Sequence, residues 1–460
     1  MASQLPADCL NEIFEHLDDK VDLRSCSLVN RLWCTVSVRI LWIDIRNYNT
    51  LFDCLPKESK EILYKNGIFP AYTSKPPLFN YATFIKRISV DQINREIHDI
   101  GLDNDKCILL AQELFKMLMK QTSLKNLYLD FYYNMFNINF TTYLGATDSL
   151  RDLSELICLS NISSKFFYQL SQICHSLKTL RVTIKNGITS ELMELISVQR
   201  NLMNLWILNF DGKDLTGIMD QVSDNLIRFH LNAGRNSHPT SLSFFSKFTK
   251  LRELVLSIKY NSETFKIFRH VIFSQLQVLK LISKYAKHDH LTKFLENNGK
   301  NLLEIYLDVI DVNPLNSAIS KYCPNLKSLD TMFNHDGFEI LKTVFNNCQQ
   351  LESVGNWCGD NYYLNETEIL DFVAKYSPKN LYELKLHYVS ERSELFTEGL
   401  LESALTTWSN RIPQRSLSLV IIDELFLRGL EVKKESTEVI EKFNKPFVIR
   451  QIRQKNFSEM

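Results

Sequence analysis

The stretch Leu251-Arg252-Glu253-Leu254-Val255-Leu256 decides the fold, because its spacing of apolar residues returns along most of the chain. An internal repeat with a period of 20 to 50 residues indicates a solenoid, a propeller or another repeat array. An ordinary leucine-rich helical protein would not keep so constant a period. Eleven such units, 24 to 30 residues apart, begin at Leu124, Leu153, Leu177, Leu202, Leu226, Leu251, Leu276, Leu302, Leu326, Leu351 and Leu381.

Each unit reads as one strand followed by one helix. Within a unit the later apolar residues, for example Leu254 and Leu256, alternate with period two, as in a strand with one buried face. Downstream, Leu291, Phe294 and Leu295 share one helical face, and Gly299 stands where a helix C-cap is expected. The same helix is predicted in other units, by Leu315, Ile319 and Tyr322, by Phe338, Leu341 and Phe345, and by Ile369, Phe372 and Val373.

The sequence therefore predicts an α/β solenoid. Its parallel strands would line the inside of a curve, and its helices would lie outside. One unit cannot bury its leucines alone, so the units must stack.

These units resemble leucine-rich repeats, which run about 20–29 residues. Cys174, Cys323 and Cys348 each stand three residues before the first leucine of a unit. This placement is similar to the cysteine-containing subclass of the repeats, and the resemblance implies thiols buried behind the strand. The asparagine typical of the family appears as Asn161 and Asn334 but is missing from most units, so the repeat boundaries are set only to within a few residues.

A different pattern occupies the N-terminus. Leu10, Ile13, Phe14 and Leu17 recur at the spacing of one helical face, and Pro6 stands at the first turn, where a helix tolerates proline. A second helix is predicted to begin after Asp22, which would be its N-cap. Its apolar residues are Leu23, Cys26, Val29 and Trp33. A third helix would run from about residue 36 to residue 42. So short a module cannot bury all its apolar surface, and we expect another protein or domain to cover it.

The N-terminal module resembles an F-box. The matching residues are Leu5-Pro6, Ile13-Phe14, Leu17, Leu28-Val29-Asn30, Trp33 and Leu41-Trp42. The resemblance implies docking onto a Skp-family adaptor, which bridges to a cullin-RING ubiquitin ligase. The adaptor contacts that it implies are Leu5, Pro6, Leu10, Ile13 and Leu17. The residues implied to hold the three helices together are Phe14, Val29, Trp33, Leu41 and Trp42. The alternative is a helical cap for the array.

Four segments follow from these patterns. Residues 1–45 form the F-box, and residues 46–121 form a linker and N-terminal cap with a degenerate repeat. The strand of that repeat is predicted at residues 84–90, and an amphipathic helix follows at residues 110–118. Residues 122–430 form the leucine-rich-repeat array. Residues 431–460 form a C-terminal cap or tail.

Composition argues against several classes of partner and location. Lys+Arg and Asp+Glu both number 53, so no net field would draw the protein to nucleic acid or to an anionic membrane. The first residues lack the basic and apolar regions of a signal peptide. The apolar run at residues 417–427 is interrupted by charges and is a poor candidate for a membrane span. Ten scattered cysteines without a Cys-x-x-Cys pair fit reduced thiols in the cytosol or nucleus.

The sequence offers no recognisable active site. It contains no glycine-rich phosphate loop, no His-Glu-x-x-His and no Gly-x-Ser-x-Gly. His288 and His290 flank Asp289, but no third metal ligand is evident nearby, and a solvated turn before a repeat helix accounts for them better. We therefore expect no catalytic residue, no metal and no cofactor.

A binding surface is expected where side chains point away from the helices, between the strand leucines. Trp206, Tyr128 and Tyr306 are candidate interface anchors, since aromatic residues are enriched at hot spots. Each could equally pack against its neighbour in the next strand. Both charge signs occur on this face, so the pattern indicates no charge class for the bound protein. The candidate residues are Tyr128, Arg181, Trp206, His230, Lys280, Tyr306, Asp308, Asp330 and Lys385.

Two functional hypotheses follow. The first is the substrate-recognition subunit of an SCF-type ubiquitin ligase, which has no chemistry of its own and acts by holding its target near the transferring enzyme. The second is a non-catalytic leucine-rich-repeat scaffold for protein–protein interaction outside the ubiquitin system. Neither names the target protein.

Overall fold

The computed structural model describes residues 5–17, 19–68, 77–129, 138–210, 215–233, 242–258, 262–283, 286–309, 312–334, 337–358, 364, 366–388, 398–412, 415–423 and 447–453. The chain divides into two units, which are described separately. The first comprises residues 1–204 and 221–223, and the second comprises residues 205–220 and 224–460.

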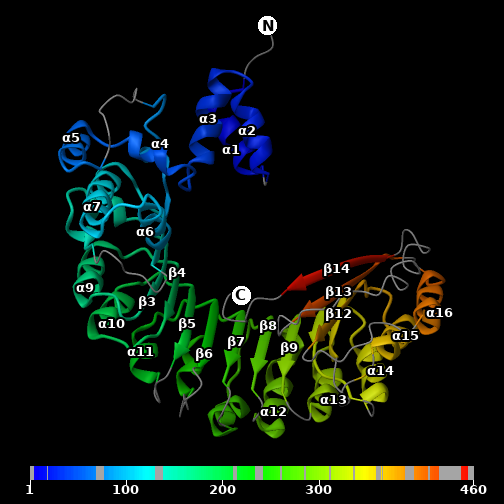
Figure 1. Ribbon diagram of the computed structural model, residues 1–460. Helices are drawn as coiled ribbons and strands as arrows, with labels where there is room; N and C mark the ends of the chain where they lie inside the picture. The colour runs from blue at the N-terminus through cyan, green and yellow to red at the C-terminus, as the bar shows by residue number, and fades with distance from the viewer. Residues whose placement is uncertain are drawn as a thin grey trace. The chain divides into compact units, whose positions relative to one another are not determined.

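Three helices form the N-terminal module, namely α1 (Ala7–Glu15), α2 (Lys20–Ser27) and α3 (Arg31–Leu41) (Figure 1). The Asp19 side chain caps α2 by accepting a hydrogen bond from the N–H of Val21 at 2.7 Å. The prediction that Asp22 is this cap was wrong, because Asp22 already lies in the first turn. The Asn30 side chain caps α3 by accepting from the N–H of Trp33 at 3.0 Å. The third helix therefore starts earlier than predicted and includes Trp33.

The core of the module consists of Leu10, Phe14, Leu23 and Val36, with Leu17, Trp33 and Leu41 packed against it. Phe14 and Trp33 meet edge to face, with their ring centroids 5.1 Å apart. Val29 is 58% exposed beyond the end of α2, so its predicted role in the core was wrong.

The module is tied to the segment that follows it. Trp42 packs on Tyr81, with ring centroids 4.3 Å apart, and therefore joins the module to that segment instead of holding its helices together. The carbonyl of Ile43 accepts hydrogen bonds from the N–H groups of Lys86 and Arg87 at 3.0 and 3.1 Å. The Arg87 guanidinium also pairs with the Asp44 carboxylate at 2.9 Å.

The rest of the first unit contains the first strands of the repeat sheet. All four strands run parallel and follow chain order, as β1 (Arg87–Ser89), β2 (Asn126–Leu129), β3 (Glu155–Leu159) and β4 (Thr179–Thr183). The strand predicted at residues 84–90 is thus present as β1. The helices are α4 (Tyr48–Asp53), α5 (Lys57–Lys65), η1 (Tyr81–Phe84), α6 (Val90–His98), α7 (Asn104–Gln121), η2 (Phe140–Thr142), α8 (Ala146–Leu150), α9 (Ser164–Ile173) and α10 (Ser190–Ser197).

The second unit continues the alternation of strands and helices. Its strands lie in chain order as β5 (Asn204–Phe210), β6 (Arg228–Ala233), β7 (Glu253–Ser257), β8 (Val278–Ile282), β9 (Glu304–Asp308), β10 (Ser328–Asp330), β11 (Ser353–Cys358), β12 (Glu383–Tyr388), β13 (Leu417–Asp423) and β14 (Phe447–Arg453). Its helices are α11 (Thr216–Gln221), η3 (Ser243–Lys247), η4 (Ser262–Arg269), α12 (His288–Asn298), η5 (Gly299–Asn301), α13 (Asn313–Tyr322), α14 (Phe338–Asn347), α15 (Glu366–Tyr376) and α16 (Glu398–Ser409).

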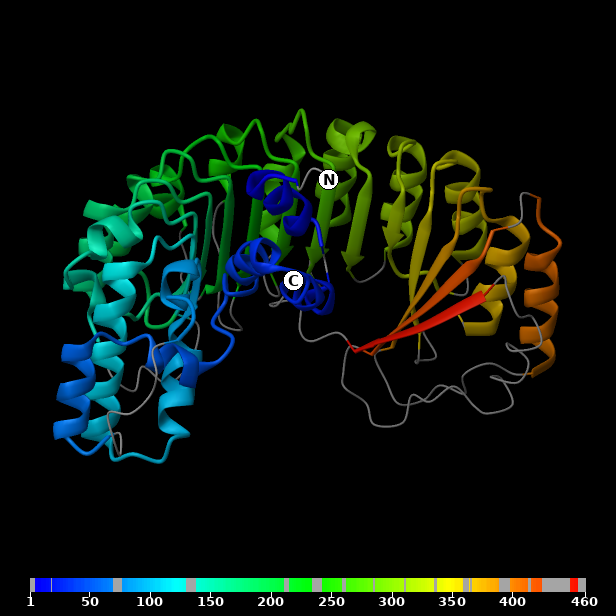
Figure 2. The same cartoon turned by 90° about the horizontal axis from the view of Figure 1, so that it is seen from above.

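In the second unit the strands form one layer and the helices another (Figures 1 and 2). We call the strand face that points away from the helices the inner face. The leucines that begin the repeats of this unit lie between the two layers, and across both units all eleven such leucines are no more than 1% exposed. The predicted solenoid of parallel strands inside and helices outside is confirmed. Strand β14 lies within the segment predicted as a tail, whereas residues 431–446 and 454–460 of that segment lie outside the described residues.

The cysteines at the helix ends are buried, as predicted. Cys174 Sγ lies 3.5 Å from the carbonyl oxygen of Leu153, and Cys348 Sγ lies 3.3 Å from that of Cys323. Burial raises the pKa of Cys174 and of Cys348 to about 11, so both thiols stay protonated and inert. By contrast, Asn161 and Asn334 are exposed on turns. Asn298, Asn316 and Asn356 are buried instead, and Asn356 accepts a hydrogen bond from the N–H of Phe333 at 2.7 Å.

Gly299 follows α12 as predicted, but for a different reason. Its φ of −60° is ordinary helical backbone, so no left-handed cap requires glycine there. Instead, a Cβ atom at this position would lie 2.7 Å from the Tyr322 carbonyl oxygen and 2.8 Å from Cys323 Sγ. Glycine is needed because the next repeat packs directly against the backbone.

We therefore expect Gly299→Ala to lower the free energy of unfolding by about 1–3 kcal/mol, the usual cost of overpacking a core. Denaturant unfolding followed by circular dichroism measures the change. Gly217→Ala is the matched control, because a Cβ atom at Gly217 would meet no atom within 4 Å. Equal unfolding midpoints for the two variants would contradict this explanation of Gly299.

No helix in the described part of the chain is both long enough and apolar enough to span a membrane.

Candidate functional site

The N-terminal module carries large apolar side chains that its own core leaves exposed. Single exposed apolar residues are common on proteins, but a concentration of them indicates an interaction surface. Ile13 is 48% exposed in α1, and Leu28 is 87% exposed at the end of α2. The exposed set in the module is Leu5, Ile13, Val21, Leu28 and Val29.

The predicted adaptor contacts differ in their exposure to solvent. Leu5, Pro6 and Ile13 are exposed, as a direct contact requires. Leu10 is only 1% exposed and belongs to the core, so the prediction that it contacts a partner was wrong. Leu17 is partly buried against the same core. The exposed residues Val21 and Leu28 were not among the contacts that the F-box resemblance implied, although Leu28 is one of the residues that match the F-box pattern.

The predicted residues of the repeat face line up across the strands. In the first unit Tyr128 pairs in register with Ile157, and Ile157 pairs with Arg181. In the second unit one row of paired residues crosses six neighbouring pairs of strands. That row is His230, Val255, Lys280, Tyr306, Asp330, Gly355 and Lys385.

Two other predicted residues lie beside this row. Trp206 packs edge to face on His230, with ring centroids 4.9 Å apart. Asp308 lies two residues after Tyr306 on β9, in register with Ile282 of β8. The second unit therefore brings its predicted residues together on the inner face.

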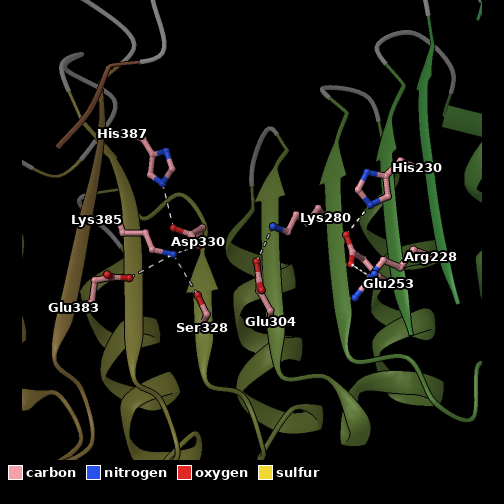
Figure 3. Close-up of polar contacts among 10 residues, drawn as sticks. All are labelled: Arg228, His230, Glu253, Lys280, Glu304, Ser328, Asp330, Glu383, Lys385 and His387. Carbon is pink, nitrogen blue, oxygen red and sulfur yellow. Dashed lines mark hydrogen bonds and ion pairs between the residues drawn. The ribbon is translucent and has the colours of Figure 1, made fainter. Parts of the chain in front are cut away.

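At the C-terminal end of the row, a network of charged side chains spans three strands (Figure 3). The Asp330 carboxylate on β10 lies 3.0 Å from Lys385 Nζ and 3.1 Å from His387 Nε2, both on β12. Lys385 Nζ also lies 3.4 Å from Ser328 Oγ and 3.8 Å from Glu383 Oε1. We call these five residues the Asp330 network.

Gly355 makes this network possible, because its strand β11 lies between β10 and β12. A Cβ atom on Gly355 would lie 2.0 Å from Asp330 Oδ1, so the carboxylate occupies the space that any other side chain would need. Glycine inside a strand often marks such a close approach. The predicted binding residues did not include Gly355. Its position as a glycine inside a predicted strand was the one feature of the sequence that could have pointed to it.

The network is charged despite its burial. Burial alone would raise the pKa of Asp330, but the hydrogen bond from His387 and the charge of Lys385 outweigh it and hold that pKa below its usual value. Burial likewise acts to lower the pKa of Lys385, and Asp330 and Glu383 reverse the effect and raise it. Lysine and aspartate therefore both stay ionised at neutral pH.

Two further rings, those of Tyr306 and Trp357, lie beside the network and pack on its His387 ring. Trp357 stacks on His387, with centroids 4.5 Å apart and an interplanar angle of 12°, and Tyr306 meets Trp357 edge to face at 5.3 Å. Trp357 was also absent from the predicted set. The rings are nearly buried, so they form a fixed apolar floor on the inner face.

Two further groups of charges on the face are also paired (Figure 3). Glu253 accepts from His230 Nε2 at 2.6 Å and pairs with Arg228 at 3.2 Å, and the hydrogen bond with His230 is the main reason that the pKa of Glu253 is lowered. Lys280 Nζ lies 2.8 Å from Glu304. In the first unit, burial and Glu155 raise the pKa of Tyr128 to about 12. Among the described residues, no group of three or more His, Cys, Asp or Glu could hold a metal ion.

Comparison with protein families matches residues 2–47 to the F-box-like model. The N-terminal module is F-box-like. The F-box-like module is followed by the strand-and-helix solenoid of leucine-rich repeats, so the two parts recognised in the sequence are both present.

A search of curated proteins finds no match in sequence. Among solved structures, the yeast Rad7–Elc1 complex matches with 14% identity and a TM-score of 0.40, covering 92% of this chain and 94% of the other. An internalin from Listeria monocytogenes has 13% identity and a TM-score of 0.34, covering 68% and 84%. The leucine-rich-repeat protein LegL7 from Legionella pneumophila has 14% identity and a TM-score of 0.37, covering 68% and 96%. These scores are too low to carry a functional argument.

Proposed function

We propose that this protein is the substrate-recognition subunit of an SCF-type cullin-RING ubiquitin ligase. Its F-box-like module would dock a Skp-family adaptor, and its repeat face would bind the target protein. The observation that carries the proposal is the exposed apolar set of the module, which includes Ile13 and Leu28. This set occurs in the segment that matches the F-box-like model.

The proposed protein has no chemistry of its own. On the inner face, the groups that could act as acids or bases are bound to one another, as Asp330 is to Lys385 and His387. A non-catalytic subunit would accelerate ubiquitin transfer by raising the effective concentration of the target near the transferring enzyme. The proposed role requires no cofactor. Such a subunit would work in the cytosol or nucleus.

The contacts that follow the module suit this role. The hydrogen bonds of Ile43 to β1, the Arg87–Asp44 pair and the Trp42–Tyr81 contact tie the module to the start of the sheet. A recognition subunit benefits from such ties, because a fixed connection limits the distances that a bound target can explore.

A non-catalytic repeat scaffold outside the ubiquitin system is the second candidate. The same contacts of Ile43 and Asp44 with β1 would let the module serve as an end cap for the sheet. A cap alone, however, does not require Leu28 and Ile13 to stay exposed.

Adaptor capture distinguishes the two functions. We expect the tagged full-length chain to co-purify with a recombinant Skp-family adaptor, and Ile13→Asp to reduce capture at least about tenfold, since a charge in an apolar interface costs its desolvation. Circular dichroism should remain unchanged, because Ile13 is half exposed.

Leu144→Asp is the matched control, since Leu144 is a highly exposed leucine of the first unit outside the module. It should bind the adaptor like the wild type. If the unaltered chain captures no adaptor, the ligase proposal fails and the scaffold function is favoured.

A further inference from the structure

We infer that Ser27, at the end of α2, is a phosphorylation site that regulates adaptor docking. A phosphate on this serine prevents the F-box-like module from binding its adaptor. The inference rests on the proposed function and adds a means of regulation to the same surface. The phosphate donor is ATP, and the enzyme is a protein kinase that selects an arginine three residues before the serine.

Ser27 lies beside the exposed apolar residues of the module. It is the last residue of α2, and the two residues that follow it, Leu28 and Val29, are 87% and 58% exposed. Their backbone is held by the last turn of the helix, where the N–H of Leu28 donates to the Ser25 carbonyl at 3.1 Å and the N–H of Val29 donates to the Cys26 carbonyl at 3.3 Å. A change at Ser27 therefore acts on the turn that presents both apolar residues.

The charges around Ser27 suit such a kinase. Arg24 stands three residues before the serine, and residues 23–43 contain three arginines but no aspartate or glutamate. Arg24 is exposed, and it forms no ion pair with any carboxylate that the structure describes. An acidic side chain of the kinase therefore binds this guanidinium without displacing a partner.

The hydroxyl lies where the helix opens most readily. The Ser27 side chain is partly exposed, and its Oγ donates a hydrogen bond to the Arg24 carbonyl at 2.6 Å. A kinase binds its substrate as an extended chain, so this last turn must unwind. Helix ends fray at little cost in free energy, and the rest of α2 can stay folded.

The transfer itself uses ordinary kinase chemistry. A carboxylate of the kinase accepts the proton of the Ser27 hydroxyl, Oγ forms a bond to the γ-phosphorus of ATP, and the bond from that phosphorus to the bridging oxygen breaks as ADP leaves.

The phosphate changes the docking surface in two ways. It carries about −1.5 to −2 charge, and its oxygens meet the Arg24 carbonyl at the negative end of the helix dipole, where the hydroxyl donated a hydrogen bond. An adaptor that covers Leu28 must also remove water from the phosphate, which is costly in an apolar interface. Phosphorylation and adaptor binding therefore oppose each other, and by linkage the bound adaptor protects Ser27 from the kinase.

Kinase treatment of the full-length protein tests the site. The probe is calcium/calmodulin-dependent protein kinase II with ATP, applied to the chain alone and to its complex with a recombinant Skp-family adaptor. Mass spectrometry of the proteolytic peptides measures phosphate at Ser27. We expect Ser27 to be phosphorylated, and the adaptor to slow the reaction at least about tenfold. An equal rate with and without the adaptor would contradict the inference.

A second serine of α2 supplies the matched control. Ser25 is also exposed and donates to a backbone carbonyl, that of Val21 at 3.1 Å, but Asp22 stands three residues before it. Ser25→Ala should therefore leave phosphorylation of Ser27 unchanged. Arg24→Gln should slow it at least about tenfold. Absence of phosphate at Ser27, or equal rates for wild type and Arg24→Gln, would reject the site.

Adaptor capture tests the consequence. The phosphorylated chain should capture at least about tenfold less adaptor than the untreated chain. Ser27→Ala should capture it like the wild type, before and after kinase treatment. Alanine removes the hydrogen bond to Arg24 without adding charge, so this variant separates the effect of the phosphate from that of the lost bond. Equal capture by the phosphorylated and untreated chains would overturn the inference.

The outcomes separate this inference from the proposed function. If the untreated chain captures no adaptor, the ligase proposal fails, whatever the state of Ser27. If the untreated chain captures the adaptor and phosphate is absent from Ser27 or without effect on capture, the inference about Ser27 alone fails.

Discussion

Replacing Phe14 with alanine is expected to unfold the F-box-like module and to abolish adaptor capture. Phe14 is 2% exposed and packs with Leu10, Leu23 and Val36, and its ring meets Trp33. Truncation of a buried phenylalanine costs about 3–5 kcal/mol. A module of this size has little stability to lose, since small cores bury little apolar surface.

Hydrogen exchange of the full-length chain measures this effect, because it reports on α1–α3 separately from the repeats. Exchange in the three helices should rise at least about a hundredfold, while the strands of the second unit stay protected. Ile13→Ala is the matched control. Ile13 is next to Phe14 in the chain but half exposed, so its truncation should leave exchange unchanged. Unchanged protection of α1–α3 in Phe14→Ala would show that this core does not hold the module together.

Gly355→Ala is expected to disrupt the Asp330 network. The new Cβ atom would lie 2.0 Å from Asp330 Oδ1, so the carboxylate must move. Lys385 and His387 would then lose Asp330 as a partner in a site that is largely buried. Breaking a buried ion pair in this way costs about 3–5 kcal/mol. We expect a loss of this size in the free energy of unfolding, measured by denaturant titration.

A double-mutant cycle identifies the cause of that loss. In an Asp330→Ala background no carboxylate opposes the Cβ atom, so Gly355→Ala should cost less than about 1 kcal/mol there. Trp357 fluorescence offers a second measurement, because Trp357 stacks on His387 next to the network. If Gly355→Ala costs the same in both backgrounds, the close approach of Asp330 is not the reason for glycine.

The repeat pattern was readable because burial imposes it residue by residue. Leu254 and Leu256 must alternate on a strand that packs on a helix, and Leu291, Phe294 and Leu295 must share a helical face, whatever surrounds them. For Cys174 and Cys348, burial behind the strand was implied by the resemblance to cysteine-containing repeats, and the structure confirms it.

The N-terminal module shows the limit of such patterns. The spacing of Leu10, Ile13, Phe14 and Leu17 indicates a common helix face, but it does not say which residues meet the core and which meet a partner. The structure buries Leu10 and exposes Ile13. Asp22 was mistaken for the cap of α2 because aspartate suits several positions in the first turn, where only a hydrogen bond such as that of Asp19 decides.

The sequence by itself determined the solenoid, its strand-and-helix units, the buried thiols and the existence of an F-box-like module. Only the tertiary structure decided the contacts of the repeat face. Asp330 and Lys385 are 55 residues apart in the chain, and the register of β10, β11 and β12 brings them to 3.0 Å across Gly355. The physical reason is that periodicity reports the burial of each residue, whereas partnership across strands depends on register, which a single sequence pattern does not contain.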